Sequence, residues 1–493
     1  MNIAFFTNYI YTPHLETELE LIQNHLDQGD VVYHFVCDAH LLSCDTNATH
    51  DLLQCEYCIA KRVKGQQLLE NKKNYFPVRI SKFHNKAAYP FPQLSFSTIK
   101  ELRNYKIDNF ELGDAALSSL VSIVREPEPD LEANRKLLSD IILSTNYMYY
   151  YFLKELAERK IDVFYIFNGR FAVDRAALRA SQKLGVKALV HERGSDYKTY
   201  ELFDNVLPHE IMPFTQRTKE FWADFPADEV KKNEIAHNFY QERVVGKEQG
   251  WISFVKEQKT GLLPENWNTE DDNIVIFTSS EDEYVSIGEE WDLGVFISQN
   301  ALVLKLKDEP KLSGKKIWVR LHPNMRLMDK KYLERTYETL QGGIGLILPD
   351  SLINSYDLIN SASKVVTFGS TVGIEATYWG KSSILVGPAF YMHFEVTYNP
   401  QTYEELVDLL LIEDLKAMPQ DNTLMYGFYV LKFGIPFSIF KPENLFVGTF
   451  KNVDLEKVFD YYKWRKRINI RGLHRIYNQL NKFNRILLLK KYV

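Results

Sequence analysis

The feature that most constrains this chain is an alternation of short apolar runs with helical patterns, which occurs in two blocks. Short apolar runs bounded by turn signals are typical of strands buried on both faces. The alternation predicts the α/β class: two doubly wound, Rossmann-like domains with parallel sheets covered by helices. In the first block the runs are 2–7, 31–37, 161–167 and 186–191, and the helical patterns are 14–26, 134–159 and 174–184. In the second block the runs are 273–278, 316–321, 345–348, 364–367 and 383–386, and the helical patterns are 328–340, 355–362 and 372–379.

A charged, turn-rich stretch at 224–272 separates the two blocks. We therefore predict an N-terminal domain at 1–245, a C-terminal domain at 265–395 and a helical C-terminal region at 396–493. The length of 493 residues agrees with two or three domains of about 150 residues each. In doubly wound sheets ligands bind beyond the carboxyl ends of the strands, and a two-domain protein places them in the cleft between its domains.

The charge of the chain is unevenly distributed. The whole chain carries a net charge of −6, but no acidic residue follows Asp460, and ten Lys and Arg residues lie within 463–493. Apolar and basic residues alternate there at helical spacing, which predicts a basic amphipathic helix. Such a helix can lie on an anionic membrane surface, or it can pack on the protein with its basic face in solvent.

The location of the protein is predicted from what the sequence lacks. It contains no apolar run long enough for a transmembrane helix and does not begin with a signal-peptide pattern. We expect a soluble, cytoplasmic protein that can also lie at the inner face of the cell membrane. Because its body is acidic, we do not expect a nucleic-acid partner.

All four cysteines lie within one short segment: Cys37, Cys44, Cys55 and Cys58. The last two have the C-x2-C spacing that allows two thiolates to bind one tetrahedral ion, which predicts a structural zinc site. The gaps between the others are not those of a standard zinc ribbon. The alternative is four free thiols, because two disulfides do not suit a cytoplasmic protein.

Two motifs at predicted strand ends have the chemistry of a phosphate site. RLHPN contains Arg320 and His322, both hydrogen-bond donors to anions. FGSTVGIE contains Ser370 and Thr371 at a predicted helix start, with Glu375 one turn later, where it could accept from ribose hydroxyls. The alternative is an ordinary helix cap with nothing bound.

Carboxylates for group transfer occur at two other strand ends. Glu192 lies in HERG, and Asp282 lies in SSEDE with Glu281 and Glu283 as rivals. Paired carboxylates can serve as acid, base or nucleophile, although each can also be a solvated or ion-paired loop residue.

Three further polar residues end strands of the first block and are predicted to bind the acceptor or the sugar. They are Asn168, Arg170 and Arg193. Arg170 could meet a substrate carboxylate or pair with Asp174.

The motifs FNGR, HERG, RLHP and FGSTVGIEA, at about 160–390, resemble bacterial capsule and lipopolysaccharide glycosyltransferases of the GT-B fold. The likeness is strongest to the retaining β-Kdo transferases that use CMP-Kdo. The resemblance implies transfer of Kdo from CMP-Kdo to a surface-polysaccharide or glycolipid acceptor held by the N-terminal domain. It assigns the nucleotide to His322, Ser370, Thr371 and Glu375. Asp282 would be the nucleophile and Glu192 the acid/base, and no cofactor is expected for catalysis.

Other functions remain open from the sequence. One is another sugar-nucleotide enzyme of the same architecture, such as a UDP- or GDP-sugar transferase, an epimerase or a hydrolase. Another is a non-enzymatic module that binds polysaccharide or membrane, for which the acidic motifs would be dispensable.

Overall fold

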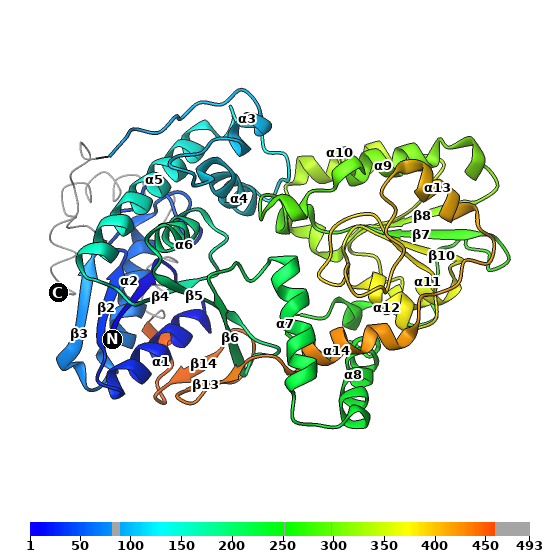
Figure 1. Cartoon of the computed structure of the whole chain (residues 1–493). Coiled ribbons are helices and arrows are strands. Elements are labelled where there is room, and N and C mark those ends of the chain that lie inside the picture. The colour runs from blue at the N-terminus through cyan, green and yellow to red at the C-terminus, as the bar shows by residue number, and fades with distance from the viewer. Residues whose placement is uncertain (81–88, 251, 297, 459–493) are drawn as a thin grey trace. The chain divides into compact units, whose positions relative to one another are not determined.

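The computed structural model describes residues 1–80, 89–250, 252–296 and 298–458 (Figure 1). The chain forms two compact units, and each is described by itself. Unit 1 comprises 1–123, 130–208 and the chain from Gly434 onward, and unit 2 comprises 124–129 and 209–433. The prediction of an α/β protein with two doubly wound parallel sheets is confirmed.

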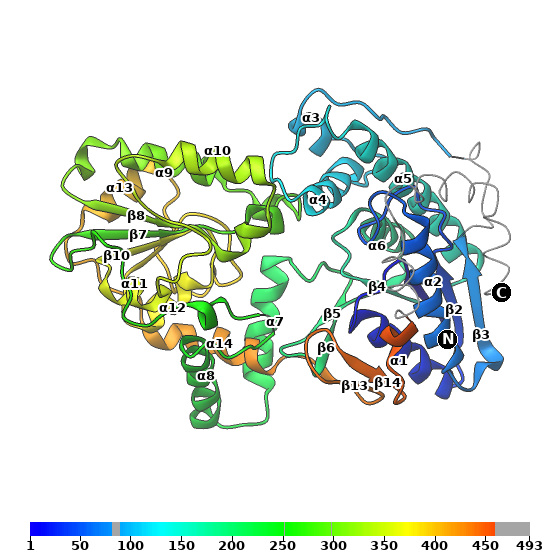
Figure 2. The ribbon, with the colours of Figure 1, turned by 180° about the vertical axis from the view of Figure 1, so that it is seen from behind.

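Unit 1 contains a seven-stranded sheet in the order β12-β6-β5-β4-β1-β2-β3. The strands from β5 to β3 are parallel, whereas β6 and β12 pair antiparallel at one edge. Helices lie over both faces of the parallel part (Figures 1 and 2). The strands are β1 (Asn2–Thr7), β2 (Val31–Val36), β3 (Tyr75–Arg79), β4 (Val163–Phe167), β5 (Lys187–Arg193), β6 (Thr199–Asp204) and β12 (Ile435–Pro436). The helices are α1 (His14–Asp27), α2 (Leu52–Gln67), α3 (Ile99–Arg103), α4 (Leu112–Val124), α5 (Arg135–Glu158) and α6 (Ala172–Leu184).

Unit 2 contains a five-stranded parallel sheet in the order β11-β10-β7-β8-β9. Its central strand β7 has the sequence NIVIF and is buried along its whole length, because helices cover both faces. The strands are β7 (Asn273–Phe277), β8 (Lys316–Arg320), β9 (Gly345–Ile347), β10 (Lys364–Thr367) and β11 (Ser383–Leu385). The helices are α7 (Ile211–Asp224), α8 (Glu229–Val244), α9 (Gln299–Lys307), α10 (Lys330–Leu340), α11 (Ser355–Ser361), α12 (Val372–Tyr378), α13 (Tyr403–Leu411) and α14 (Leu424–Lys432).

The registers of the strands bring the predicted motifs together within each unit. Phe277 pairs with Arg320 on β8 and with Thr367 on β10, so the loops after these three strands leave the same edge of the unit 2 sheet. In unit 1, Phe167 pairs with His191, so the loop after β4 starts beside the last residues of β5.

The chain passes between the units at places that differ from the predicted domain bounds. After Pro208, rather than near 245, the chain enters unit 2, because α7 and α8 pack with α14 through aromatic side chains such as Phe214, Phe221 and Phe428. The stretch 224–272 is polar because it forms the exposed side of α8 and a surface loop of unit 2.

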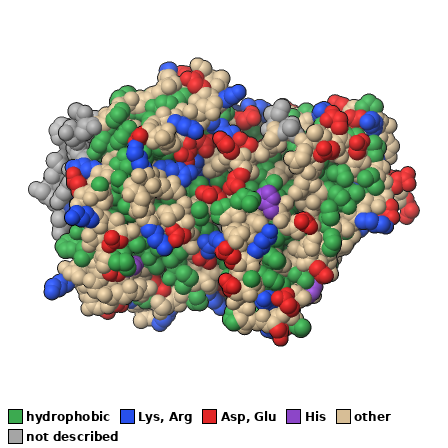
Figure 3. Space-filling view, in the orientation of Figure 1, with side chains coloured by type: hydrophobic (Ala, Val, Ile, Leu, Met, Phe, Trp, Pro, Cys, Tyr) green, Lys and Arg blue, Asp and Glu red, His purple; other side chains and the backbone are tan. Residues whose placement is uncertain are grey.

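The region after 396, predicted to be helical, is divided. It contributes α13 and α14 to unit 2 and then returns to unit 1 as β12 and the hairpin β13 (Phe440–Pro442) and β14 (Gly448–Phe450). The basic tail at 463–493 lies outside the described residues. Within the described part of the chain, no helix combines the length and apolar character needed to cross a membrane. On the face shown in Figure 3, basic and acidic side chains are interspersed.

Candidate active site

His322 lies just beyond β8 and is held as a neutral hydrogen-bond donor. Its Nδ1 accepts from the backbone N–H of Asn324 at 3.2 Å, capping the short 3-10 helix Pro323–Leu327. A backbone N–H can only donate, so the proton of the neutral imidazole lies on Nε2. Burial and the nearby Arg320 lower the pKa of His322 to about 4. At neutral pH the ring therefore offers an Nε2–H for which no described residue is an acceptor.

Arg320 uses its guanidinium inside the protein. Its Nη1 donates to the carbonyl of Leu348 at 2.9 Å and its Nη2 to that of Ser351 at 3.1 Å, which fixes the loop after β9. Burial lowers the pKa of Arg320 to about 10, against the opposing charge of Asp350. Only Nε lacks a hydrogen-bond partner among the described residues. Arg320 thus positions a neighbouring loop, and its predicted contact with a donor phosphate stays a prediction.

The turn after β10 presents two hydroxyl groups. The backbone N–H of Val372 donates to Ser370 Oγ at 3.3 Å, and Arg243 Nη2 donates to Thr371 Oγ1 at 2.8 Å. Because both oxygens accept from the protein, each hydroxyl keeps its own proton for another acceptor. The turn needs Gly369, with φ of +121°, since a Cβ there would lie 2.3 Å from the carbonyl oxygen of Pro388.

Glu375 accepts hydrogen bonds from Arg243 and Tyr356, neither of which was predicted from the sequence. Arg243 Nε donates to its Oε1 at 2.8 Å, and the Tyr356 hydroxyl donates to its Oε2. Burial alone would lower the pKa of Arg243, but the Glu375 carboxylate outweighs it and raises the pKa. Both carboxylate oxygens therefore have protein partners, and the predicted ribose contact would require one of them to move.

The acidic loop after β7 separates its three carboxylates. Asp282 is buried: Oδ1 accepts from Ser280 Oγ at 2.6 Å, and Oδ2 lies 2.9 Å from Arg125 Nε. Glu281 accepts from the Tyr332 hydroxyl at 3.0 Å, and burial raises its pKa. Glu283 is exposed and accepts from the side chain of Asn324. Asp282, the predicted nucleophile, is thus buried and ion-paired, whereas Glu281 is half-buried and Glu283 is exposed.

Glu192, at the end of β5 in unit 1, is held by two neighbouring elements. Its Oε2 accepts from Asn168 Nδ2 at 2.7 Å, and its Oε1 lies 3.4 Å from His14 Nε2. The side chain remains 23% exposed. Burial lowers the pKa of His14 to about 3, so this imidazole is neutral and Glu192 is not part of a charged pair with it. The structure thus brings together Glu192 and Asn168, which were predicted separately as a catalytic and a sugar- or acceptor-binding residue.

The two predicted arginines of unit 1 have their own partners. Arg170 is buried, and its Nε donates to Ser118 Oγ at 3.0 Å. Arg193 Nη2 donates to the carbonyl of Leu445 at 3.2 Å, and its guanidinium lies 5.9 Å from the ring centre of Phe446. Their predicted roles in binding the acceptor or sugar stay predictions.

A buried polar network beside these residues was missed from the sequence. Glu18 accepts from Tyr9 and from Thr7, and its Oε1 lies 3.1 Å from His34 Nε2. The Tyr9 hydroxyl also lies 3.0 Å from His191 Nε2. Burial alone would raise the pKa of Glu18, but the hydrogen bond from His34 and the neighbouring charges lower it. The members lie on β1, α1, β2, β5 and the loop after β1, so no local spacing indicates them.

None of the four cysteines forms a disulfide, and three of them have separate polar neighbours. Cys55 accepts from Asn47 Nδ2 at 3.2 Å, Cys44 lies 3.2 Å from Thr46 Oγ1, and Cys58 lies 3.9 Å from the carbonyl of Tyr9. Burial, with the other thiols nearby, raises the pKa of Cys58 to about 12. Within the described ranges no three His, Cys, Asp or Glu side chains are placed to hold a metal ion, so the thiols as placed do not fit zinc. The zinc site stays a prediction for metal analysis.

Part of the chain matches a model of a known protein family. Residues 204–416 match the family model described as capsule polysaccharide biosynthesis protein, which confirms the resemblance to capsule-synthesis proteins over this segment. The segment includes the loops after β7, β8 and β10. No curated protein matches the chain.

Several solved structures are similar at low scores. The KpsC beta Kdo 2,4 transferase of Thermosulfurimonas dismutans is 15% identical, with 54% of this chain and 79% of that chain covered and a TM-score of 0.37. The KpsC beta Kdo 2,7 transferase of the same organism is 14% identical, with 64% and 89% covered and a TM-score of 0.33. MurG of Acinetobacter baumannii is 12% identical, with 94% and 99% covered and a TM-score of 0.27. At such scores these likenesses carry no argument about activity.

Proposed function

We propose that this protein, whose residues 204–416 match the capsule polysaccharide biosynthesis family, is a glycosyltransferase that transfers Kdo from CMP-Kdo to a surface-polysaccharide or glycolipid acceptor. The observation that carries the proposal is a set of donors at one edge of the unit 2 sheet. The Nε2–H of His322 and the hydroxyl protons of Ser370 and Thr371 all remain available there. Such a set suits the phosphate of a departing nucleotide.

The donor half of the reaction is assigned to unit 2. As the bond between the anomeric carbon and the phosphate oxygen breaks, negative charge grows on CMP, and donors fixed in advance stabilise it. His322 donates without carrying a charge of its own, because its pKa lies near 4. Arg320 acts indirectly by holding the loop at Leu348 and Ser351.

The transfer half is assigned to two carboxylates. Asp282 forms a bond to the anomeric carbon while the bond to CMP breaks. The acceptor oxygen then displaces Asp282 while Glu192 takes the hydroxyl proton, which gives retention. Partial exposure and the hydrogen bond from Asn168 support the role of Glu192. The ion pair with Arg125 means that Asp282 must leave its partner to react, so Glu281 and Glu283 remain alternatives.

The test of the donor is a binding experiment with the full chain. We expect CMP to raise the melting temperature more than UMP, UDP or GDP does, and the His322→Ala variant to lose most of that shift. Arg326→Ala is the control, because Arg326 is exposed and pairs with Glu257 nearby in the same unit. A selective response to UDP or GDP would keep a transferase but reject CMP-Kdo. No response to any nucleotide would reject the transferase.

Activity is tested with CMP-Kdo and a capsule or glycolipid acceptor, with release of CMP as the measured product. Release of CMP that requires the acceptor supports transfer. Turnover of the nucleotide sugar without an acceptor would indicate an epimerase or a hydrolase instead. Association of the 463–493 tail with anionic vesicles is a separate prediction and does not bear on the donor.

A further inference from the structure

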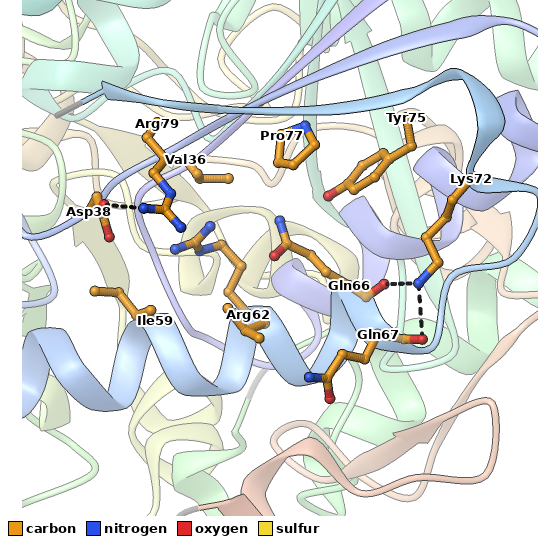
Figure 4. Close-up of a pocket in the computed structure, with 11 residues that line it drawn as sticks. Val36, Asp38, Ile59, Arg62, Gln66, Gln67, Lys72, Tyr75, Pro77 and Arg79 are labelled. Atoms are coloured by element: carbon orange, nitrogen blue, oxygen red, sulfur yellow. Dashed lines mark hydrogen bonds and ion pairs between the residues drawn. The ribbon is translucent and has the colours of Figure 1, made fainter. Parts of the chain in front are cut away.

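Unit 1 contains a cavity that is lined by none of the residues assigned to transfer. Its volume is about 420 Å³, within the range of small-molecule sites. Figure 4 shows it between helix α2 and the neighbouring strands β2 and β3. Its lining residues come from these three elements, the loop after β2 and the turn before β3: Val36, Asp38, Ile59, Arg62, Val63, Gln66, Gln67, Lys72, Tyr75, Pro77 and Arg79.

A buried arginine without a carboxylate partner lies in this cavity. Arg62 is 5% exposed, and its hydrogen bond is from Nη2 to the carbonyl of Cys37 at 3.3 Å. Among the described residues no carboxylate forms an ion pair with it. A buried charge is costly unless an opposite charge or several hydrogen bonds offset the cost. The unused donors of Arg62 therefore point to an anion that none of the described residues supplies.

A second arginine supports the same conclusion. Arg79, at the end of β3, lies across the cavity from Arg62 in Figure 4. Its Nη1 forms a long ion pair with Asp38 Oδ2, at 3.9 Å, without a hydrogen bond. The two guanidiniums and Lys72 outnumber the single carboxylate of Asp38, so the lining has an excess of positive charge. Paired guanidinium groups are the preferred donors to phosphate and carboxylate groups.

The remaining lining suits a polar ring. Ile59, Val63 and Pro77 form apolar walls. Tyr75 and Gln66 form a polar wall, and His34 holds both side chains in place. Its Nδ1 lies 2.7 Å from the Tyr75 hydroxyl and 3.2 Å from Gln66 Nε2. A sugar presents one less polar face and several hydroxyl groups, and this mixture of walls can accept both.

We propose that this cavity, the arginine pocket, binds an anionic saccharide, with its phosphate or carboxylate between Arg62 and Arg79 and its ring between α2 and β3. The site is additional to the transfer site and does not depend on the proposed function. The chemistry common to a sugar phosphate and an acidic sugar is the anionic group on a hydroxylated ring.

The test measures binding to the full chain by titration calorimetry. The probes are glucose 6-phosphate and glucuronate, with glucose and inorganic phosphate for comparison. We expect at least one anionic sugar to bind more tightly than both comparison ligands, and binding to weaken as salt is added. Equal binding of glucose would reject the anion requirement, and equal binding of inorganic phosphate would reject the saccharide. No binding of either anionic sugar would overturn the proposal.

Variants place the binding in the arginine pocket. Arg79→Gln should weaken it at least about tenfold, and so should Arg62→Gln if that buried variant folds. Asp38→Asn should tighten it, because it removes the one opposing carboxylate, and a variant that is merely destabilised cannot do this. Arg135→Gln is the matched control, since Arg135 is exposed and pairs with Glu132 elsewhere in unit 1. Unchanged binding in Arg79→Gln would overturn the proposal.

One more variant separates this site from the proposed donor site. His322→Ala should leave binding of the anionic sugar unchanged, and Arg79→Gln should leave binding of CMP unchanged. Loss of sugar binding in His322→Ala would show that the probe occupies unit 2 and would reject the arginine pocket. Failure of CMP to bind, with sugar binding intact, would reject only the proposed donor.

Discussion

Arg243 at the end of α8 donates from Nε to Oε1 of Glu375 in α12 at 2.8 Å, across 132 positions of sequence. The same guanidinium donates to Thr371, so one side chain connects α8 to both the hydroxyl turn and the first helix turn of the candidate nucleotide site. Glu375 is 2% exposed and cannot exchange its partner for water.

Removing this arginine should destabilise unit 2. Arg243→Ala leaves the Glu375 carboxylate with only Tyr356, and breaking a buried pair costs about 3–5 kcal/mol. Because Arg243 is 33% exposed, we expect a loss of stability at or somewhat below the lower end of this range, about 2–3 kcal/mol. Chemical denaturation checks this, with Lys231→Ala as the control because Lys231 forms an exposed pair with Glu234 on the same helix. Equal stability of the two variants would contradict the structure.

The protonation of His322 has a definite pH dependence. Burial and Arg320 lower its pKa to about 4 in the folded protein, below the ordinary value of about 6.5. The stability it contributes is therefore present above about pH 6.5 and is lost as the pH falls toward 4. Nitrogen NMR of the imidazole should show a protonated Nε2 and an unprotonated Nδ1 at pH 6 to 8. The opposite tautomer, or titration near pH 6.5, would contradict the assignment.

Replacing Glu192 should strongly slow transfer and leave nucleotide binding intact. A general base contributes about 10²–10⁴-fold, so Glu192→Gln should reduce kcat by this factor. Asn168→Ala should reduce kcat less and shift its pH profile, because Asn168 only holds the carboxylate. Glu201→Gln is the control, since Glu201 is the cross-strand neighbour of Glu192 on β6. Normal turnover in Glu192→Gln would remove Glu192 from the mechanism.

The three carboxylates after β7 can be distinguished by parallel substitution. We expect Asp282→Asn to lose transfer and also to lower stability, because Arg125 loses its buried partner. Glu283→Gln, at an exposed position, should change stability least. Kinetics with CMP binding as the check of folding decides the assignment. Loss of transfer in Glu281→Gln or Glu283→Gln, with Asp282→Asn still active, would move the nucleophile to that residue.

Metal analysis of the purified protein decides the state of the cysteines. With the thiols as placed, we expect less than one equivalent of zinc, and slow alkylation of Cys58 because burial raises its pKa to about 12. One equivalent of zinc that the Cys58→Ser variant loses would instead establish the predicted zinc site.

Strands and helices with a strong apolar pattern were predictable from local sequence. The runs at 2–7 and 273–278 coincide with β1 and β7, and the pattern at 14–26 coincides with α1. A strand buried on both faces appears as a continuous apolar run, and a helix packed on a sheet shows apolar residues at helical spacing. The placement of His322, Ser370 and Glu192 at strand ends follows from the same pattern. The edge strand β3 and the strand β6, next to the other edge, were missed because they are partly exposed.

The sequence by itself therefore determined the α/β class and the strand-end positions of the motifs, whereas the tertiary structure alone decided which polar groups meet. Lys61 in α2 is completely buried, and its ammonium group donates to Glu456, 395 positions later, because the chain returns to unit 1 after Gly434. Likewise, Arg62 becomes a binding candidate only because α2 packs beside β2 and β3, where no carboxylate of the described residues forms an ion pair with it. Hydrophobic period is a local property, but a buried charge takes its partner from whichever element the fold packs against it.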